Sequence, residues 1–132
     1  MIAIDTSVLV RYVVGSPPDQ ARAAGTLIEA GEEIGISPVA LVEGAHVLRT
    51  QYSVSHAHVI DALIAFVQRE NVRILGGRTD VIVGMLVRAR TLAGRPIPDA
   101  LIVAAAMGAD AVALATFDRG QGRYGLEVLQ PE

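Results

Sequence analysis

The chain has 132 residues, which allows one domain with a hydrophobic core but not two, so we expect a single domain over residues 1–132. It contains no cysteine, which excludes a disulfide framework, a thiolate metal site and a cysteine nucleophile. Its net charge is -3, and its 11 basic residues are all arginine, so every mechanism that needs a catalytic lysine is excluded.

Short apolar runs alternate with helical patterns along the whole chain. In chain order the pattern predicts a strand over 1–5, helices over 6–13 and 19–30, a strand over 33–36, a helix over 39–51, a helix opened by Ser55, a strand over 71–75, a helix from Thr79, a helix over 99–109, and strands over 111–115 and 126–129. Ser37 followed by Pro38 is a typical helix start. The strands are short and apolar and alternate with helices, which indicates an α/β fold, a three-layer α/β/α sandwich with a central parallel sheet.

Acidic residues stand at positions where such a fold binds ligands, beyond the carboxyl ends of its strands. Asp5 follows the first strand, and Asp118 follows the strand near Thr116. Asp99 begins the helix before that strand, and Glu43 lies inside an apolar helix. We expect these four carboxylates to meet at one edge of the sheet.

Four clustered carboxylates repel one another unless a cation lies between them. A site of oxygen ligands alone suits Mg²⁺ or Mn²⁺, which activate water for hydrolysis of a phosphodiester. Hydroxyl groups nearby are candidates to support the site, and arginines flanking it are candidates to bind RNA phosphates. The hydroxyls are those of Thr6, Ser7 and Thr116, and the arginines are Arg95, Arg119 and Arg123.

Each acid also has an ordinary structural explanation. Asp5 and Asp99 are suited to cap the helices that follow them, and Asp118 lies in a sequence typical of a turn. Glu43 shares a helix face with Val39, so we expect its carboxylate to point inward among apolar neighbours. A buried carboxylate there needs a metal ion or an arginine as its partner.

Four segments together resemble the PIN domain, and their order and spacing are similar to the VapC-type ribonuclease toxins of bacterial toxin-antitoxin pairs. They are residues 4–9, residues 37–48 around Glu43, residues 98–106 and residues 115–119. The resemblance implies a Mg²⁺- or Mn²⁺-dependent endoribonuclease, with Asp5 and Asp99 as the principal metal ligands and Glu43 and Asp118 completing the set. It also implies a homodimer and a small antitoxin that covers the acidic pocket.

The sequence departs from the family's pattern at two places. Ser7 stands where many relatives have asparagine, and Gln121-Gly122 stands where an aromatic residue is common. Both positions lie next to a proposed ligand. We therefore expect the placement of the substrate near them to differ.

Other enzyme classes and a non-catalytic role are the alternatives. A haloacid-dehalogenase-like phosphohydrolase needs a second aspartate at position 7 and a lysine, and a receiver domain also needs a lysine, whereas position 7 is serine. No G-x-G-x-x-G follows the first strand, which disfavours a dinucleotide-binding domain. A PIN-like module that binds RNA or protein without catalysis remains open.

The composition also bears on location and partners. Hydrophobic residues make up 52% of the chain, more than a lone domain of this size needs, so we expect apolar surface to face a second copy or another protein. Asp5 and Arg11 interrupt the first apolar stretch, which disfavours a signal peptide, and no apolar run is long enough to span a bilayer. We expect a cytoplasmic protein.

Overall fold

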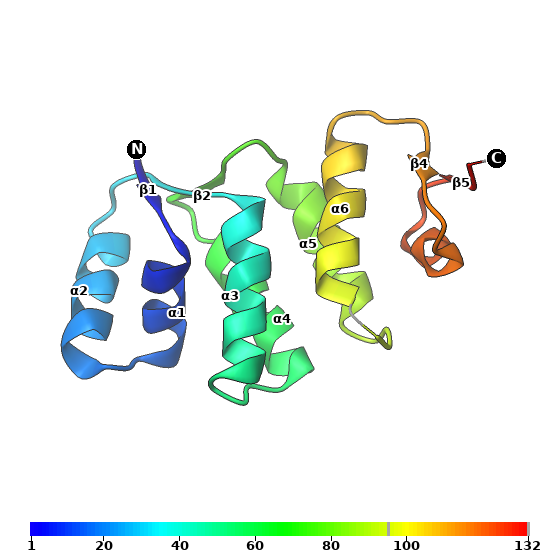
Figure 1. Cartoon of the computed structure of the whole chain (residues 1–132). Coiled ribbons are helices and arrows are strands. Elements are labelled where there is room, and N and C mark those ends of the chain that lie inside the picture. The colour runs from blue at the N-terminus through cyan, green and yellow to red at the C-terminus, as the bar shows by residue number, and fades with distance from the viewer. Residues whose placement is uncertain (95, 132) are drawn as a thin grey trace. The chain divides into compact units, whose positions relative to one another are not determined.

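The computed structural model describes residues 1–94 and 96–131, and for Arg119 it describes the backbone only. The chain divides into two compact units, Met1–Gly76 and Gly77–Glu132, which are described separately below. Figure 1 shows the order of the helices and strands along the chain.

The first unit contains a parallel sheet of three strands. Strands β1 (Ile2–Ile4), β2 (Ile34–Ile36) and β3 (Val72–Ile74) pair in the order β1-β2-β3, with Ile4 opposite Ile36 and Ile36 opposite Ile74. β2 is the central strand and is buried at every residue. β1 lies at the edge of the sheet and, although its residues are apolar, only Ile4 of it is buried.

Four helices of the first unit begin and end where local signals place them. They are α1 (Thr6–Val14), α2 (Pro18–Glu29), α3 (Pro38–Thr50) and α4 (His56–Val67). The Ser37 hydroxyl caps α3 by accepting the Ala40 amide, as its position before Pro38 predicts, and Ser55 caps α4 in the same way. α1 packs against α2 and α3, and α3 packs against α4. The predicted strands and helices of this unit are thus present.

The core of the first unit consists of aliphatic side chains from both its helices and its sheet. Leu9 of α1, Ile36 of β2 and Leu41 of α3 are among those with no exposed surface. Burial of aliphatic area of this kind is the main stabilising contribution to a small unit.

The second unit pairs two helices and two short strands. It contains α5 (Thr79–Ala89), α6 (Pro96–Gly108), β4 (Leu114–Ala115), the 3₁₀ helix η1 (Arg119–Tyr124) and β5 (Val128–Leu129). β4 and β5 are parallel, and α6 packs against both α5 and η1. α5 buries an apolar stripe that consists of Ile82, Met85, Leu86 and Ala89.

The fold is α/β with parallel strands, as predicted, and two details differ. The strands form one three-stranded and one two-stranded sheet instead of a single sheet. Helix α6 begins at Pro96, three residues before the predicted start at Asp99, because proline is well suited to the first turn of a helix.

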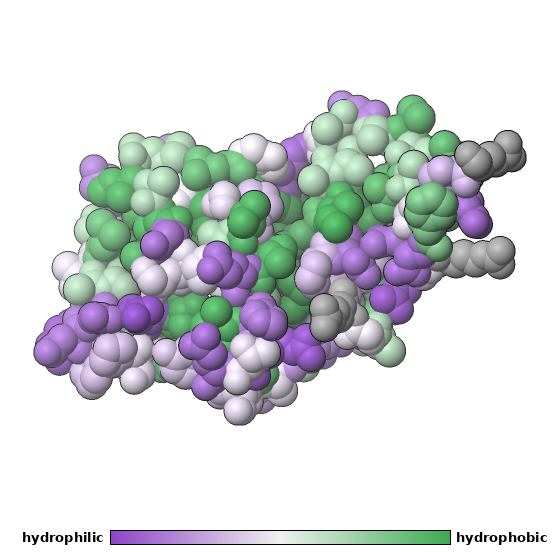
Figure 2. All heavy atoms as spheres, in the orientation of Figure 1, coloured by the Kyte–Doolittle hydropathy of each residue, from purple (hydrophilic) through white to green (hydrophobic). Residues whose placement is uncertain are grey.

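Apolar surface is visible over both units in Figure 2. The exposed large hydrophobic residues of the described chain are Met1, Ile2, Val39, Tyr52, Val87, Ile102, Val112, Phe117 and Leu129. Among the described residues, none of the helices has the length and apolar character needed to cross a membrane.

Candidate active site

Asp5 is fixed at the end of β1 by the start of the next helix. Its carboxylate oxygen Oδ1 accepts the Val8 amide at 3.2 Å, so Asp5 is the N-cap of α1, and it also accepts the Ser7 hydroxyl at 2.6 Å. The Ser7 hydrogen bond and then the Val8 amide hold the pKa of Asp5 below its ordinary value, and Arg11 adds to the effect. The predicted role of Asp5 as a helix cap is confirmed. In this role its carboxylate is exposed and ionised.

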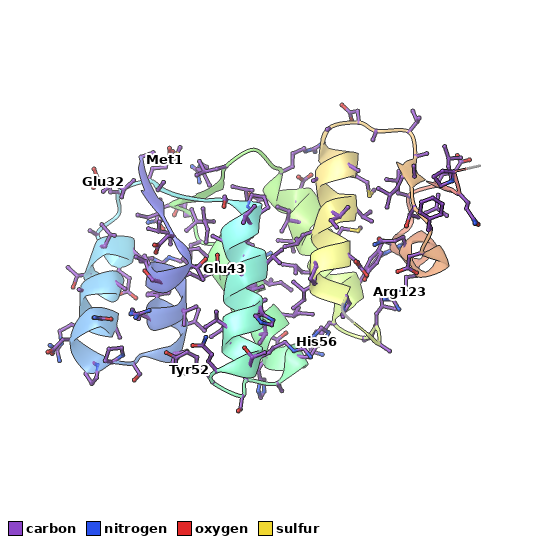
Figure 3. All side chains as sticks on the ribbon, in the orientation of Figure 1. Met1, Glu32, Glu43, Tyr52, His56 and Arg123 are labelled. Atoms are coloured by element: carbon purple, nitrogen blue, oxygen red, sulfur yellow. The ribbon has the colours of Figure 1, made fainter. Side chains whose placement is uncertain are left out.

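Glu43 meets the Asp5 segment through the neighbouring residue Thr6. The Thr6 hydroxyl donates to Glu43 Oε2 at 3.0 Å, across 37 residues of sequence. Figure 3 shows Glu43 on the side of α3 that faces α1. Glu43 is therefore held against Thr6, the residue that follows Asp5 in the chain.

The environment of Glu43 differs from the one expected from its apolar neighbours. Glu43 is exposed, and Val39, one turn before it, has 73% of its surface exposed. The buried face of α3 is instead the one that carries Ala40, Leu41, Gly44, Ala45 and Leu48. The expectation of an inward carboxylate is wrong, because α3 buries its small and leucine side chains and leaves the Val39 face in solvent.

Gly44 explains how α1 comes close enough for the Thr6 contact. A Cβ atom at position 44 would lie 2.9 Å from Leu9 Cδ2 and 4.0 Å from Thr6 Cγ2. Leu9 has no exposed surface and is therefore not free to move aside. The glycine allows α1 and α3 to approach each other next to Glu43.

In the second unit, Asp99 lies in the first turn of α6 and not at its N-cap. It is partly buried, whereas Pro96, Ile97 and Ala100 around it are buried. A carboxylate in a first turn interacts favourably with the helix dipole. Because α6 begins at Pro96, Asp99 is not its N-cap, and the capping explanation of Asp99 is wrong.

Asp118 precedes η1 and caps it. Its Oδ1 accepts the Gly120 amide at 2.8 Å, while its own amide donates to the Thr116 hydroxyl at 2.9 Å. A Cβ atom at Gly120 would lie 3.1 Å from Asp118 Oδ1, so a side chain there would crowd the carboxylate. The turn role predicted for Asp118 is confirmed, and the carboxylate is exposed.

Tyr124 is a residue of this region that the sequence reading missed. It has no exposed surface, and its hydroxyl donates to the Pro96 carbonyl oxygen at 3.0 Å. Burial raises the pKa of the Tyr124 phenol, Arg123 opposes this shift, and the charges of Asp99 and Asp118 add to it. The only signal in the sequence was an aromatic residue in a glycine-rich turn, where a buried side chain is unusual.

The predicted phosphate-binding arginines are only partly described. Arg95 lies outside the described residues, and so does the side chain of Arg119. The Arg123 guanidinium lies 5.5 Å from the centre of the Tyr124 ring, in a cation–π contact, and its residue is exposed. Arg123 therefore keeps a solvent-facing charge in the last turn of η1.

Two of the four acids lie in each unit. Thr6, which follows Asp5, binds Glu43 in the first unit, and in the second unit the charges of Asp99 and Asp118 both raise the pKa of Tyr124. Within neither unit do the described residues form a group of three or more histidine or acidic side chains that is ready to hold a metal ion. His46 and His58 are exposed, and His56 is partly buried.

Comparison with known proteins identifies the domain. A family model described as the PIN domain matches residues 2–126, a range that includes all four acids. No curated protein matches the chain.

Proposed function

The chain belongs to the PIN domain family, because the family's model covers residues 2–126, and we propose that it is a Mg²⁺- or Mn²⁺-dependent endoribonuclease. PIN domains are generally nucleases and typically use divalent metal ions. We further propose that the protein is the toxin of a type II toxin-antitoxin pair. The single nuclease domain over residues 1–132 is part of this proposal, and the family match across both units supports it.

The observation that carries the proposal is the link between Asp5 and Glu43. Asp5 lies beyond the carboxyl end of a parallel strand, where α/β folds bind ligands, and Glu43, on a separate helix, accepts a hydrogen bond from Thr6, the residue that follows Asp5. The low pKa of Asp5 keeps this carboxylate ionised at neutral pH. Exposed, ionised oxygen donors held in place by hydrogen bonds fit a hard cation such as Mg²⁺ or Mn²⁺.

We assign the four acids to one catalytic set. Asp5, Glu43, Asp99 and Asp118 would hold the ion, which when bound supplies an activated water and neutralises charge on the phosphate. Ser7 and Thr6 orient the carboxylates of Asp5 and Glu43 by hydrogen bonds. Thr116 fixes the backbone of Asp118 in the same way.

The residues around the acids have roles toward RNA in this proposal. Arg123 is exposed in the last turn of η1, the helix that Asp118 caps, and would bind a phosphate of the substrate, together with Arg95 and Arg119. We also propose that a second copy and a small antitoxin cover apolar and acidic surface. The exposed hydrophobic residues, such as Phe117 at 77% exposure, support a protein partner of this kind.

Cleavage of a structured RNA in Mg²⁺, in Mn²⁺ and in EDTA tests the function. We expect cleavage with either metal, none with EDTA, and none for Asp5→Asn, which stays folded because asparagine is also a good N-cap. Asp19→Asn is the matched control, since Asp19 is an exposed acid in the first turn of α2 and pairs only with Arg22 in the described structure. Cleavage in EDTA, or an active Asp5→Asn, contradicts the proposal.

A non-catalytic module that binds RNA or protein is the second candidate. It predicts RNA binding without cleavage under all three conditions. The haloacid-dehalogenase-like alternative predicts turnover of a small phosphate ester and intact RNA. The same assay, with a phosphate ester added, separates the three.

A further inference from the structure

We propose that Tyr124 is a positioning residue that holds Asp118 at a fixed place relative to Asp99, an inference that rests on the proposed nuclease function. Asp99 lies in the first turn of α6, and Asp118 lies at the start of η1, so the two reach any common ligand from separate elements. A metal site requires its ligands to be held within a fraction of an ångström. A contact between α6 and η1 is therefore needed to fix the two carboxylates relative to each other.

The Tyr124 hydroxyl makes this connection. Its hydrogen bond to the Pro96 carbonyl joins the last residue of η1 to the first residue of α6. Pro96 stands three residues before Asp99, which is one turn of the helix. Tyr124 itself is completely buried, so the contact is shielded from water and from competing hydrogen bonds.

The hydrogen bonds that the structure describes for Asp118 are local. Its carboxylate binds the Gly120 amide, and its amide binds the Thr116 hydroxyl, both within two residues along the chain. These bonds orient Asp118 inside its own turn. Gln121, the other buried residue of the described part of η1, has an Oε1 atom without a hydrogen-bond partner and so provides no polar link through that atom.

The charges around the phenol agree with this geometry. The carboxylates of Asp99 and Asp118 both act on Tyr124 and raise the pKa of its hydroxyl in addition to burial. The raised pKa keeps the phenol a neutral hydrogen-bond donor at pH 7.

The carboxyl end of η1 is held from a second side. Arg88 of α5 donates to the Arg123 carbonyl oxygen at 3.2 Å. Gly125 follows with φ of 92°, and a Cβ atom there would lie only 2.8 Å from Arg88 Nη1. The backbone next to Tyr124 is thus held by a hydrogen bond from α5, while the Tyr124 hydroxyl binds α6.

Tyr124→Phe tests the proposal by removing one oxygen and keeping the buried ring. We measure the hydrogen exchange of the Gly120 amide by NMR and the Kd for Mn²⁺ by calorimetry. Tyr12→Phe is the matched control, because the Tyr12 hydroxyl also makes a side-chain hydrogen bond, to Glu29 at 3.1 Å, in the first unit. We expect exchange at Gly120 to become at least about fivefold faster and the Kd to rise at least about threefold in Tyr124→Phe alone.

Unchanged exchange at Gly120 overturns the proposal, and so does an unchanged Kd in a protein whose wild type binds Mn²⁺. If the wild type neither binds Mn²⁺ nor cuts RNA, the proposed nuclease function fails, and the exchange result alone decides whether Tyr124 fixes the Asp118 turn. If Tyr124→Phe does not fold, hydrogen exchange in the wild-type protein tests the proposal instead. Its Tyr124 hydroxyl proton should be observable as a slowly exchanging NMR signal, and exchange as fast as that of Tyr52, which is 38% exposed, overturns the proposal.

Discussion

Thr6 on α1 donates its hydroxyl hydrogen to Glu43 on α3, with 3.0 Å between Oγ1 and Oε2. This contact joins the first residue of α1 to a residue of α3 that lies 37 positions later. Since Glu43 is exposed, the hydrogen bond restricts a side chain that would otherwise sample many rotamers. The first prediction follows from that restriction.

Thr6→Val should lower RNA cleavage much more than it lowers stability. The variant keeps the shape of the side chain and removes the donor to Glu43, and a net hydrogen bond contributes about 1 kcal/mol to stability. A misplaced ligand costs more in rate, so we expect at least about a tenfold loss of activity. Thr6→Ser restores the donor and should restore activity. Equal activity of the valine and serine variants would show that the contact has no part in catalysis.

Gly44→Ala should destabilise the protein, whereas Gly25→Ala should stabilise it. Alanine favours a helix over glycine by about 1 kcal/mol. At position 25 a Cβ atom meets nothing within 4 Å, so this gain is kept. At position 44 it meets Leu9 at 2.9 Å, and overpacking of about 1–3 kcal/mol outweighs the gain. Urea unfolding of both variants measures the difference, and a stabilised Gly44→Ala would refute the close packing of α1 on α3.

Ser7→Ala should raise the pKa of Asp5 toward its ordinary value. The Ser7 hydroxyl is the largest cause of the low pKa, and it stabilises the ionised carboxylate. Because the pKa in the folded state lies below that in the unfolded state, this group stabilises the fold above pH 3.8 and loses its effect as the pH falls through the folded pKa. An NMR titration of the Asp5 carboxyl carbon provides the measurement. Ser16→Ala, at an exposed serine remote in sequence from Asp5, should leave the titration unchanged.

Alkaline pH should weaken the fold partly through Tyr12. Burial is the largest cause of its raised pKa, followed by its hydrogen bond to Glu29. The folded pKa therefore exceeds the unfolded value of 10.0, so stability is fully present below pH 10.0 and is lost as the pH rises through the folded pKa. Tyr12→Phe should lose less stability between pH 9 and alkaline pH than the wild type does, as thermal unfolding at each pH will show. A steeper loss in the variant would contradict the burial of this phenol.

The sequence alone determined the order and kind of the elements. The alternation of apolar strands with helical patterns predicted an α/β fold, and local signals such as Ser37-Pro38 predicted helix starts, because capping depends on neighbouring residues. The capping roles of Asp5 and Asp118 were predictable for the same reason. Each of these features involves residues within a few positions of one another.

Only the tertiary structure decided which side chains are buried and which elements contact each other. It placed Glu43 in solvent, because packing of α1 against Gly44 determines which side of α3 is buried, and helical periodicity could not assign that side. It buried Tyr124 and joined it to Pro96, a contact across 28 residues for which no local pattern exists. Contacts of this kind depend on which elements become neighbours in the fold, and the free energy that selects those neighbours comes from many buried side chains together and not from any one motif.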